Sequence, residues 1–174
     1  MKRIVLLLAA LLIAGSVYAQ SGSRTDEVKG FQWGVHYKQE VFGYDGWLFQ
    51  ASANASMGYR FNRRNYLGAQ TGYAFKAFVS GIGGNDPCNA IPFLADYIHY
   101  CPIGKAKKNS FIWGAEAGAM IVLYVEETGL VMNELWPFAG LKAGLDFAIA
   151  DYTHLMIALR ANYLGPGISI GFTF

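Results

Sequence analysis

The stretch 47–61, WLFQASANASMGYRF, decides the fold of this chain. All of its odd positions are apolar or aromatic, whereas Leu48 is the only apolar residue among its even positions. Successive side chains of a strand point to opposite faces, so a period of two separates an apolar face from a polar face. As a helix, the same residues would form no apolar stripe. Strands usually hold about 5–6 residues, and this alternating stretch is much longer. The pattern therefore predicts a strand long enough to cross a bilayer.

The N-terminus has the features of an export signal. Residues 4–14, IVLLLAALLIA, form an apolar run behind two basic residues, and a small-residue site ends at Ala19. The run is shorter than the ~20 apolar residues that a membrane helix needs. This combination is typical of a secretory signal peptide, with a retained anchor helix as the alternative. We predict a signal peptide over 1–19, a flexible segment over 20–29 and a barrel over 30–174.

The composition of the chain indicates a membrane protein and argues against nucleic-acid binding. Charged residues make up 15% of the chain, against about 25% in soluble domains, and aromatic residues make up 16%. An exported, apolar chain without helical spans can cross lipid only as a closed barrel, because every backbone amide there needs a partner. The net charge is +2 without a long basic run, which gives no case for nucleic-acid binding.

Alternating segments recur along the whole chain. The first runs from near residue 30 to a loop at 42–46, and the others cover 47–61, 66–78, 91–100, 111–124, 135–149, 155–163 and 168–174. In the 91–100 segment Leu94 and Ile98 share parity with Asp96, so the pattern does not assign its faces. These segments predict an all-β fold, an eight-stranded antiparallel up-and-down transmembrane β-barrel preceded by a signal peptide.

Alternation alone fits a soluble barrel as well as a membrane barrel. A face in contact with water carries roughly a quarter to a third charged residues, but the polar face here holds mostly Gly, Ser, Asn and Gln. Trp47 and Phe49 lie near one end of the 47–61 stretch and Tyr59 near the other, as in the aromatic girdles of membrane barrels. We therefore expect the apolar face to meet lipid and the polar face to fill a narrow interior.

These features resemble the small outer-membrane β-barrel family of Gram-negative bacteria, to which OmpA and OmpX belong. The matching features are the signal ending at Ala19, the eight alternating segments, and the final strand ISIGFTF, which ends at Phe174. The resemblance implies a location in the cell outer membrane, in contact with its lipid. It also implies recognition of the strand ending at Phe174 by barrel-assembly machinery.

The resemblance further implies that both ends of the chain face the periplasm. The turns at 62–65, 102–110 and 151–152 would then be periplasmic. The segments 42–46, 77–90, 125–133 and 164–167 would face outward, where an unidentified surface ligand could bind.

Charged residues on the polar faces of three consecutive strands are the candidate site: Glu116, Lys142, Asp146 and Arg160. A charge inside a narrow barrel loses water and needs a counter-charge and hydrogen bonds. Acids and bases on neighbouring strands can supply these partners. We predict a structural network that fills the lumen, and a gated ion path is the alternative.

No catalytic, cofactor or metal site is predicted. The histidines His36, His99 and His154 lack ligand spacing. Cys88 and Cys101 fall at opposite ends of one predicted strand, too far apart for a disulfide. We therefore predict a structural or surface-interaction protein that is not an enzyme. The alternatives are a narrow pore for ions or small solutes and, third, a lipid-modifying enzyme, which would need a nucleophile, a base and an orienting carboxylate together.

Overall fold

The computed structural model describes residues 29–43, 47–80, 89–104, 108–125, 131–162 and 165–174. The predicted signal peptide at 1–19 lies outside these residues, as does the predicted 20–29 segment except for Lys29. In the described part, no helix is long and apolar enough to cross a membrane.

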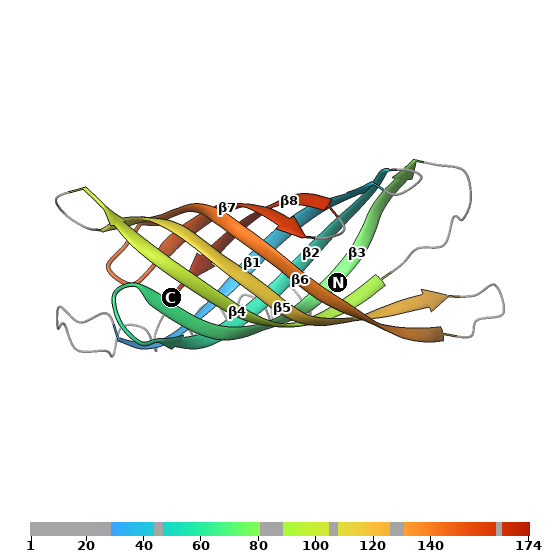
Figure 1. Cartoon of the computed structure of the whole chain (residues 1–174), viewed down its shortest axis with the longest axis horizontal. Coiled ribbons are helices and arrows are strands. Elements are labelled where there is room, and N and C mark those ends of the chain that lie inside the picture. The colour runs from blue at the N-terminus through green and yellow to red at the C-terminus, as the bar shows by residue number, and fades with distance from the viewer. Residues whose placement is uncertain (1–28, 44–46, 81–88, 105–107, 126–130, 163–164) are drawn as a thin grey trace, which may run out of the picture.

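Eight strands form a closed barrel in which each strand pairs antiparallel with its neighbours in chain order (Figure 1). The strands are β1 (Gly30–Gly43), β2 (Trp47–Arg60), β3 (Asn65–Ser80), β4 (Asn89–Ile103), β5 (Asn109–Val125), β6 (Val131–Ala148), β7 (His154–Asn162) and β8 (Gly165–Thr173). Pairing of β8 with β1 closes the sheet. The predicted eight-stranded up-and-down barrel is confirmed, with strand ends shifted by a few residues.

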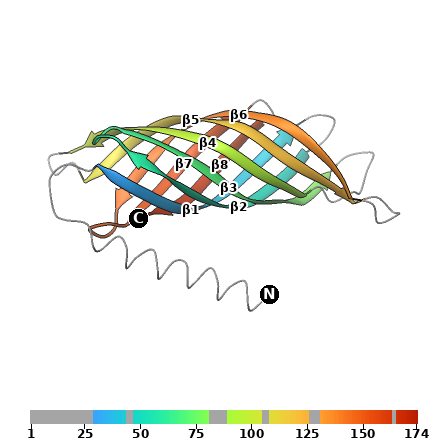
Figure 2. The same ribbon diagram turned by 90° about the horizontal axis from the view of Figure 1, so that it is seen from below.

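The two ends of the barrel are distinguished by the chain termini. Gly30 and Phe174 lie at one end together with the turns 61–64, 104–108 and 149–153, and we call this the terminus end. The segments 44–46, 81–88, 126–130 and 163–164 connect the strands at the opposite end, which we call the far end. Figure 2 shows the tilted strands running between these ends around the lumen.

The described side chains sort by face as alternation predicts. Large apolar residues with high exposure lie on the outer face, among them Leu159 with 71% and Phe31 with 66% of their surface exposed. The charged residues within strands whose side chains are described all lie on the inner face, and each is 6% exposed or less: Lys38, Glu40, Arg60, Asp96, Glu116, Lys142, Asp146 and Arg160. An apolar exterior around a charged interior is the pattern of a membrane barrel.

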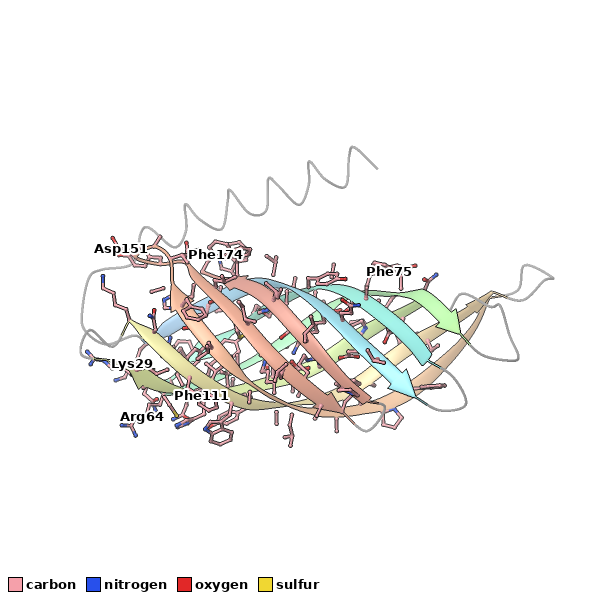
Figure 3. All side chains as sticks on the ribbon, turned by 90° about the horizontal axis from the view of Figure 1, so that it is seen from above. Lys29, Arg64, Phe75, Phe111, Asp151 and Phe174 are labelled. Atoms are coloured by element: carbon pink, nitrogen blue, oxygen red, sulfur yellow. The ribbon has the colours of Figure 1, made fainter. Side chains whose placement is uncertain are left out.

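Exposed aromatic residues lie on the outer surface near the terminus end: Phe31, Tyr59, Phe61, Phe111, Trp113 and Tyr152. Towards the far end the exposed aromatic residues are Tyr37, Tyr73, Phe75 and Phe93. Figure 3 shows Phe111 at one end of the barrel and Phe75 towards the other. The predicted girdle positions Trp47 and Phe49 lie among the side chains that are not described.

The faces of β4 follow one parity throughout. Leu94, Asp96 and Ile98 all point inward and are at most 4% exposed. The expectation of a uniformly polar interior is therefore wrong, because the lumen also buries large apolar side chains. Adjacent strands contribute more of them, such as Ile112 and Met120 on β5.

Candidate functional site

A layer of six ionised side chains occupies the middle of the lumen. Three are cations and three are carboxylates, and they come from five strands: Lys38 and Glu40 from β1, Asp96 from β4, Glu116 from β5, Lys142 from β6 and Arg160 from β7. Equal numbers of opposite charges make the layer neutral. We call these six residues the central charge layer.

Glu116 is the centre of this layer. Its carboxylate accepts hydrogen bonds from Lys38 Nζ, with both oxygens at 3.2 Å, and from Lys142 Nζ at 3.3 Å. Arg160 donates a further hydrogen bond to it. Removing a carboxylate from water costs on the order of several kcal/mol. The three cations that contact Glu116 offset this cost.

The remaining members of the layer pair around this centre. Lys142 Nζ lies 2.6 Å from Asp96 Oδ1, and Arg160 donates to Glu40. Lys38 also donates to the side-chain oxygen of Gln70 on β3. The layer therefore ties β1, β3 and β4 to β5, β6 and β7 across the lumen.

The structure places the four predicted site residues in two groups. Glu116, Lys142 and Arg160 come together in the central charge layer. Asp146 lies apart from them, near the terminus end, where its carboxylate is 2.8 Å from His154 Nδ1. Its strand leads directly into the 149–153 turn, so Asp146 lies about one row of side chains from the barrel mouth.

Three members of the layer were missed from the sequence. Lys38 and Glu40 lie on the polar parity of their segment, whereas Asp96 shares parity with Leu94 and Ile98, and the contacts of all three residues lie across the lumen. Lys38 and Glu116 are 78 positions apart in the chain. Lys38 and Glu40 could have been found from the sequence, because each is a charged residue on the polar face of its segment.

Two apolar clusters lie on either side of the central charge layer. The cluster towards the terminus end contains Tyr66, Ile98, Tyr100, Ile112, Met156 and Ala158, and the one towards the far end contains Ala74, Ala90, Leu94, Met120, Val122 and Phe138. We call them the terminus plug and the far plug. On β4 and β5 each acid lies between apolar residues of both plugs, so the lumen is filled in three layers.

Small polar residues and glycines fill the side of the lumen formed by β8, β1 and β2. His36 and Ser56 are hydrogen-bonded at 2.8 Å, and Asn54 donates to Ser52. A Cβ atom on Gly171 would lie 2.2 Å from His36 Nδ1, so glycine there gives the imidazole its space. On this side of the lumen the imidazole of His36 lies over Gly171, among small polar side chains.

Comparison with known proteins identifies the fold. No family model matches the chain, and no curated protein matches its sequence. Among solved structures, Neisserial surface protein A (NspA) is similar, with 15% identity and a TM-score of 0.68 over 82% of this chain and 95% of NspA. The chain has the fold of the small eight-stranded outer-membrane β-barrels. At this identity, the likeness concerns the fold alone.

Two further outer-membrane barrels show the same likeness. Ail, the attachment invasion locus protein of Yersinia pestis, has 14% identity and a TM-score of 0.51 over 82% of this chain and 93% of its own. The N-terminal β-barrel domain of Pseudomonas aeruginosa OprF has 12% identity and a TM-score of 0.50 over 82% and 97%. This chain thus covers nearly the full length of each of these barrels.

A hydrolytic arrangement would need a hydroxyl next to the His154–Asp146 pair of this barrel. Ser110 is the register partner of Asp146 across β5 and β6, but no hydrogen bond joins it to His154 among the described residues. A serine that is not linked to the base lacks the contact through which the base would activate it. Asp146 and His154 form a hydrogen-bonded pair near the terminus end of the barrel.

The remaining candidates for chemistry are separated in the barrel. In the described ranges no group of three His, Cys, Asp or Glu side chains is placed to hold a metal ion. Cys101 is a free thiol near the terminus end of β4, and Cys88 is not among the described residues.

Proposed function

We propose that this protein is an integral outer-membrane β-barrel with a closed lumen and a structural or surface-interaction role. The observation that supports this most strongly is the three-layer filling of the lumen. The central charge layer is neutral and its members pair with one another. The terminus plug buries apolar side chains on one side of this layer, and the far plug does so on the other side. An ion entering this path would have to displace paired charges and packed apolar groups together.

Several independent features support the location. The export signal predicted from the sequence, the apolar exterior with aromatic residues near both ends, and the fold shared with NspA, Ail and OprF all agree with an outer-membrane protein. An even number of strands brings both chain ends to the same side. We infer that the terminus end faces the periplasm, because the chain reaches the membrane from that side.

The C-terminal residue closes the seam of the barrel. Phe174 N donates to Trp33 O at 2.8 Å, Trp33 N donates back to Phe174 O at 3.2 Å, and their rings stack at 4.4 Å. We infer that the strand ending at Phe174 is the segment recognised by barrel-assembly machinery. Its last residue then completes the pairing of β8 with β1.

The connecting segments give the two ends of the barrel opposite charge. Those at the far end contain four acids, Asp45, Asp86, Glu126 and Glu127, and no Lys or Arg. One structure of Ail holds the heparin analogue sucrose octasulfate. For this chain we infer a surface partner that is neutral or cationic, because acids at the far end repel a polyanion.

Envelope fractionation combined with gel migration tests the proposal. The protein should be found in the outer membrane and should migrate differently before and after boiling, because an unboiled barrel stays folded. Planar bilayers containing the purified protein should show no conductance steps. A soluble periplasmic protein with heat-independent mobility would contradict the location, and regular conductance steps would favour the narrow-pore alternative.

The orientation has its own test. Protease added to intact cells should cleave within 81–88 at the far end and spare the 61–64 turn at the terminus end. Cells with a permeabilised outer membrane provide the control, because both sites then become reachable. Cleavage at 61–64 in intact cells would reverse the orientation.

A further inference from the structure

A cluster of polar and aromatic side chains lies on the outer face of β3, β4 and β5 near the terminus end. Asn65, His99 and Trp113 are direct register partners across these strands, and Tyr97 lies one row away. Among the described strand residues, His99 is the only histidine on the outer face, where no described Asp, Glu, Lys or Arg side chain is found. Polar groups at a lipid-facing position are costly and often mark function.

Hydrogen bonds and ring contacts fix the geometry of this cluster. Asn65 Oδ1 accepts from Tyr97 Oη at 2.8 Å and lies 2.9 Å from His99 Nδ1. Because an amide oxygen only accepts, His99 Nδ1 carries its proton and donates. The Trp113 ring lies 5.0 Å from the His99 ring and 6.0 Å from the Tyr97 ring, measured between centroids. Because the proton of the neutral ring is on Nδ1, His99 Nε2 becomes a second donor only when the imidazole is protonated.

The backbone of Arg64 is fixed next to this cluster by a hydrogen bond. Arg64 directly precedes Asn65 and is exposed, and its carbonyl oxygen accepts from Tyr100 N at 2.7 Å. The turns at this end are rich in cations, with Arg63 and Lys108 also exposed. Figure 3 shows Arg64 on the same side of the barrel end as Phe111, and Asp151 on the other side. Positive charge thus gathers where the polar cluster meets the headgroup region.

We propose that Arg64 together with the Asn65–Tyr97–His99–Trp113 cluster binds the phosphate group of an anionic phospholipid, with phosphatidylglycerol as the probe lipid. The proposal rests on the membrane location proposed above. A guanidinium presents planar donors that match phosphate oxygens. A protonated His99 would donate from Nε2 to the phosphate as well. Charge complementarity selects an anionic headgroup over a zwitterionic one.

The outer surface next to the cluster can accommodate an acyl chain. Ala95, Ala117 and Ala139 are register partners across β4, β5 and β6, and Ala115 and Ala119 flank Ala117 on the same face of β5. The stretch from Ala115 to Ala119 is about 13 Å long at about 3.3 Å per residue. These short alanine side chains line the outer face of β5 from Trp113 towards the far end, and an acyl chain would pack against them.

Native mass spectrometry of the protein purified in detergent tests the proposal. The amount of lipid retained is compared for phosphatidylglycerol, phosphatidylcholine and an uncharged diacylglycerol. Phosphatidylglycerol should be retained most strongly, and inorganic phosphate should not displace it. The R64Q/H99L variant should bind phosphatidylglycerol about tenfold more weakly, as expected for the loss of a charge-assisted hydrogen bond. The matched variant K29Q/F31L, which also removes one cation and one exposed ring at this end, should keep its affinity.

Each other outcome overturns a defined part of the proposal. Equal retention of phosphatidylglycerol and phosphatidylcholine overturns the anionic headgroup, and displacement by inorganic phosphate overturns the lipid. Unchanged affinity in R64Q/H99L, or an equal loss in K29Q/F31L, overturns the site. Heat-dependent gel migration shows that each variant is a folded barrel. If the protein is a membrane-inserted barrel that retains charged and uncharged lipids equally, this inference alone is refuted. If the protein is soluble, the proposed function is refuted.

Discussion

Lys142 Nζ lies 2.6 Å from Asp96 Oδ1, although β6 and β4 are separated in the sheet by β5. Both side chains are nearly inaccessible to solvent, with 2% and 3% of their surface exposed. The lysine reaches over the intervening strand and also contacts Glu116 on it. A Cβ atom on Gly114 of β5 would lie 3.2 Å from Lys142 Cε, so glycine at this position leaves the room in which the lysine stem crosses β5.

Removing Lys142 alone should destabilise the barrel strongly. K142M leaves Asp96 buried without its cation, and breaking a buried pair in this way costs about 3–5 kcal/mol. The double variant D96L/K142M should recover most of that loss, because Lys38 and Arg160 still balance the two remaining carboxylates. Urea unfolding of the protein refolded in lipid vesicles measures both values. An exposed control, D151N, should stay within about 0.5 kcal/mol of the parent.

If K142M unfolds like the parent protein, Asp96 is neutral or hydrated and the layer is not a network of paired ions. A double variant that is no more stable than K142M would show that packing around the lysine stem, and not charge balance, sets the cost.

How far the sequence predicts this interior is clearest on β5. Glu116 was recognised because a lone acid on a polar face needs a partner. Ile112, Met120 and Val122 share its parity, yet alternation assigned no role to them. A narrow lumen excludes water as lipid does, so large apolar residues are stable on either face. Alternation therefore predicts the strands and the outer face reliably, but not the composition of the interior.

The membership of the charge layer could not be read from single segments. Whether Lys38 meets Glu116 depends on the register of all strands between them and on barrel closure, which no local pattern encodes. Asp146 shows the same limit: its parity is correct, but its height along the barrel places it with His154 at the mouth. Parity gives the face of a residue, and only the assembled register gives its neighbours.

The terminus plug should contribute to stability independently of the charges. Ile112 is completely buried, so I112A should destabilise the barrel by about 2–5 kcal/mol, and I112V by only about 0.5–1.5 kcal/mol. Both variants should remain non-conducting in planar bilayers, because the central charge layer and the far plug are intact. Conductance in I112A would mean that this plug alone closes the lumen.

Position 171 should require glycine because the imidazole ring of His36 lies over it. A Cβ there would meet His36 Nδ1 at 2.2 Å and the Val35 carbonyl oxygen at 2.7 Å, whereas a Cβ on Gly140 finds no atom nearer than 3.3 Å. We expect G171A to cost about 1–3 kcal/mol through overpacking and G140A to cost clearly less. Chemical unfolding compares the two. Equal stability of both variants would show that the β8–β1 side is loosely packed.

A charged residue placed on the outer face should destabilise the barrel more, the closer it lies to the bilayer midplane. Leu159 is 71% exposed and lies on β7 between the aromatic residues of both ends, whereas Ile103, 48% exposed, is the last residue of β4 at the terminus end. An arginine near the bilayer midplane costs about 2–4 kcal/mol and one near the interface about 0–1 kcal/mol. L159R should therefore unfold at much lower urea concentration than I103R in the same vesicles. If both variants match the parent protein, the apolar outer face does not lie in lipid, because a charge on a hydrated surface has little effect.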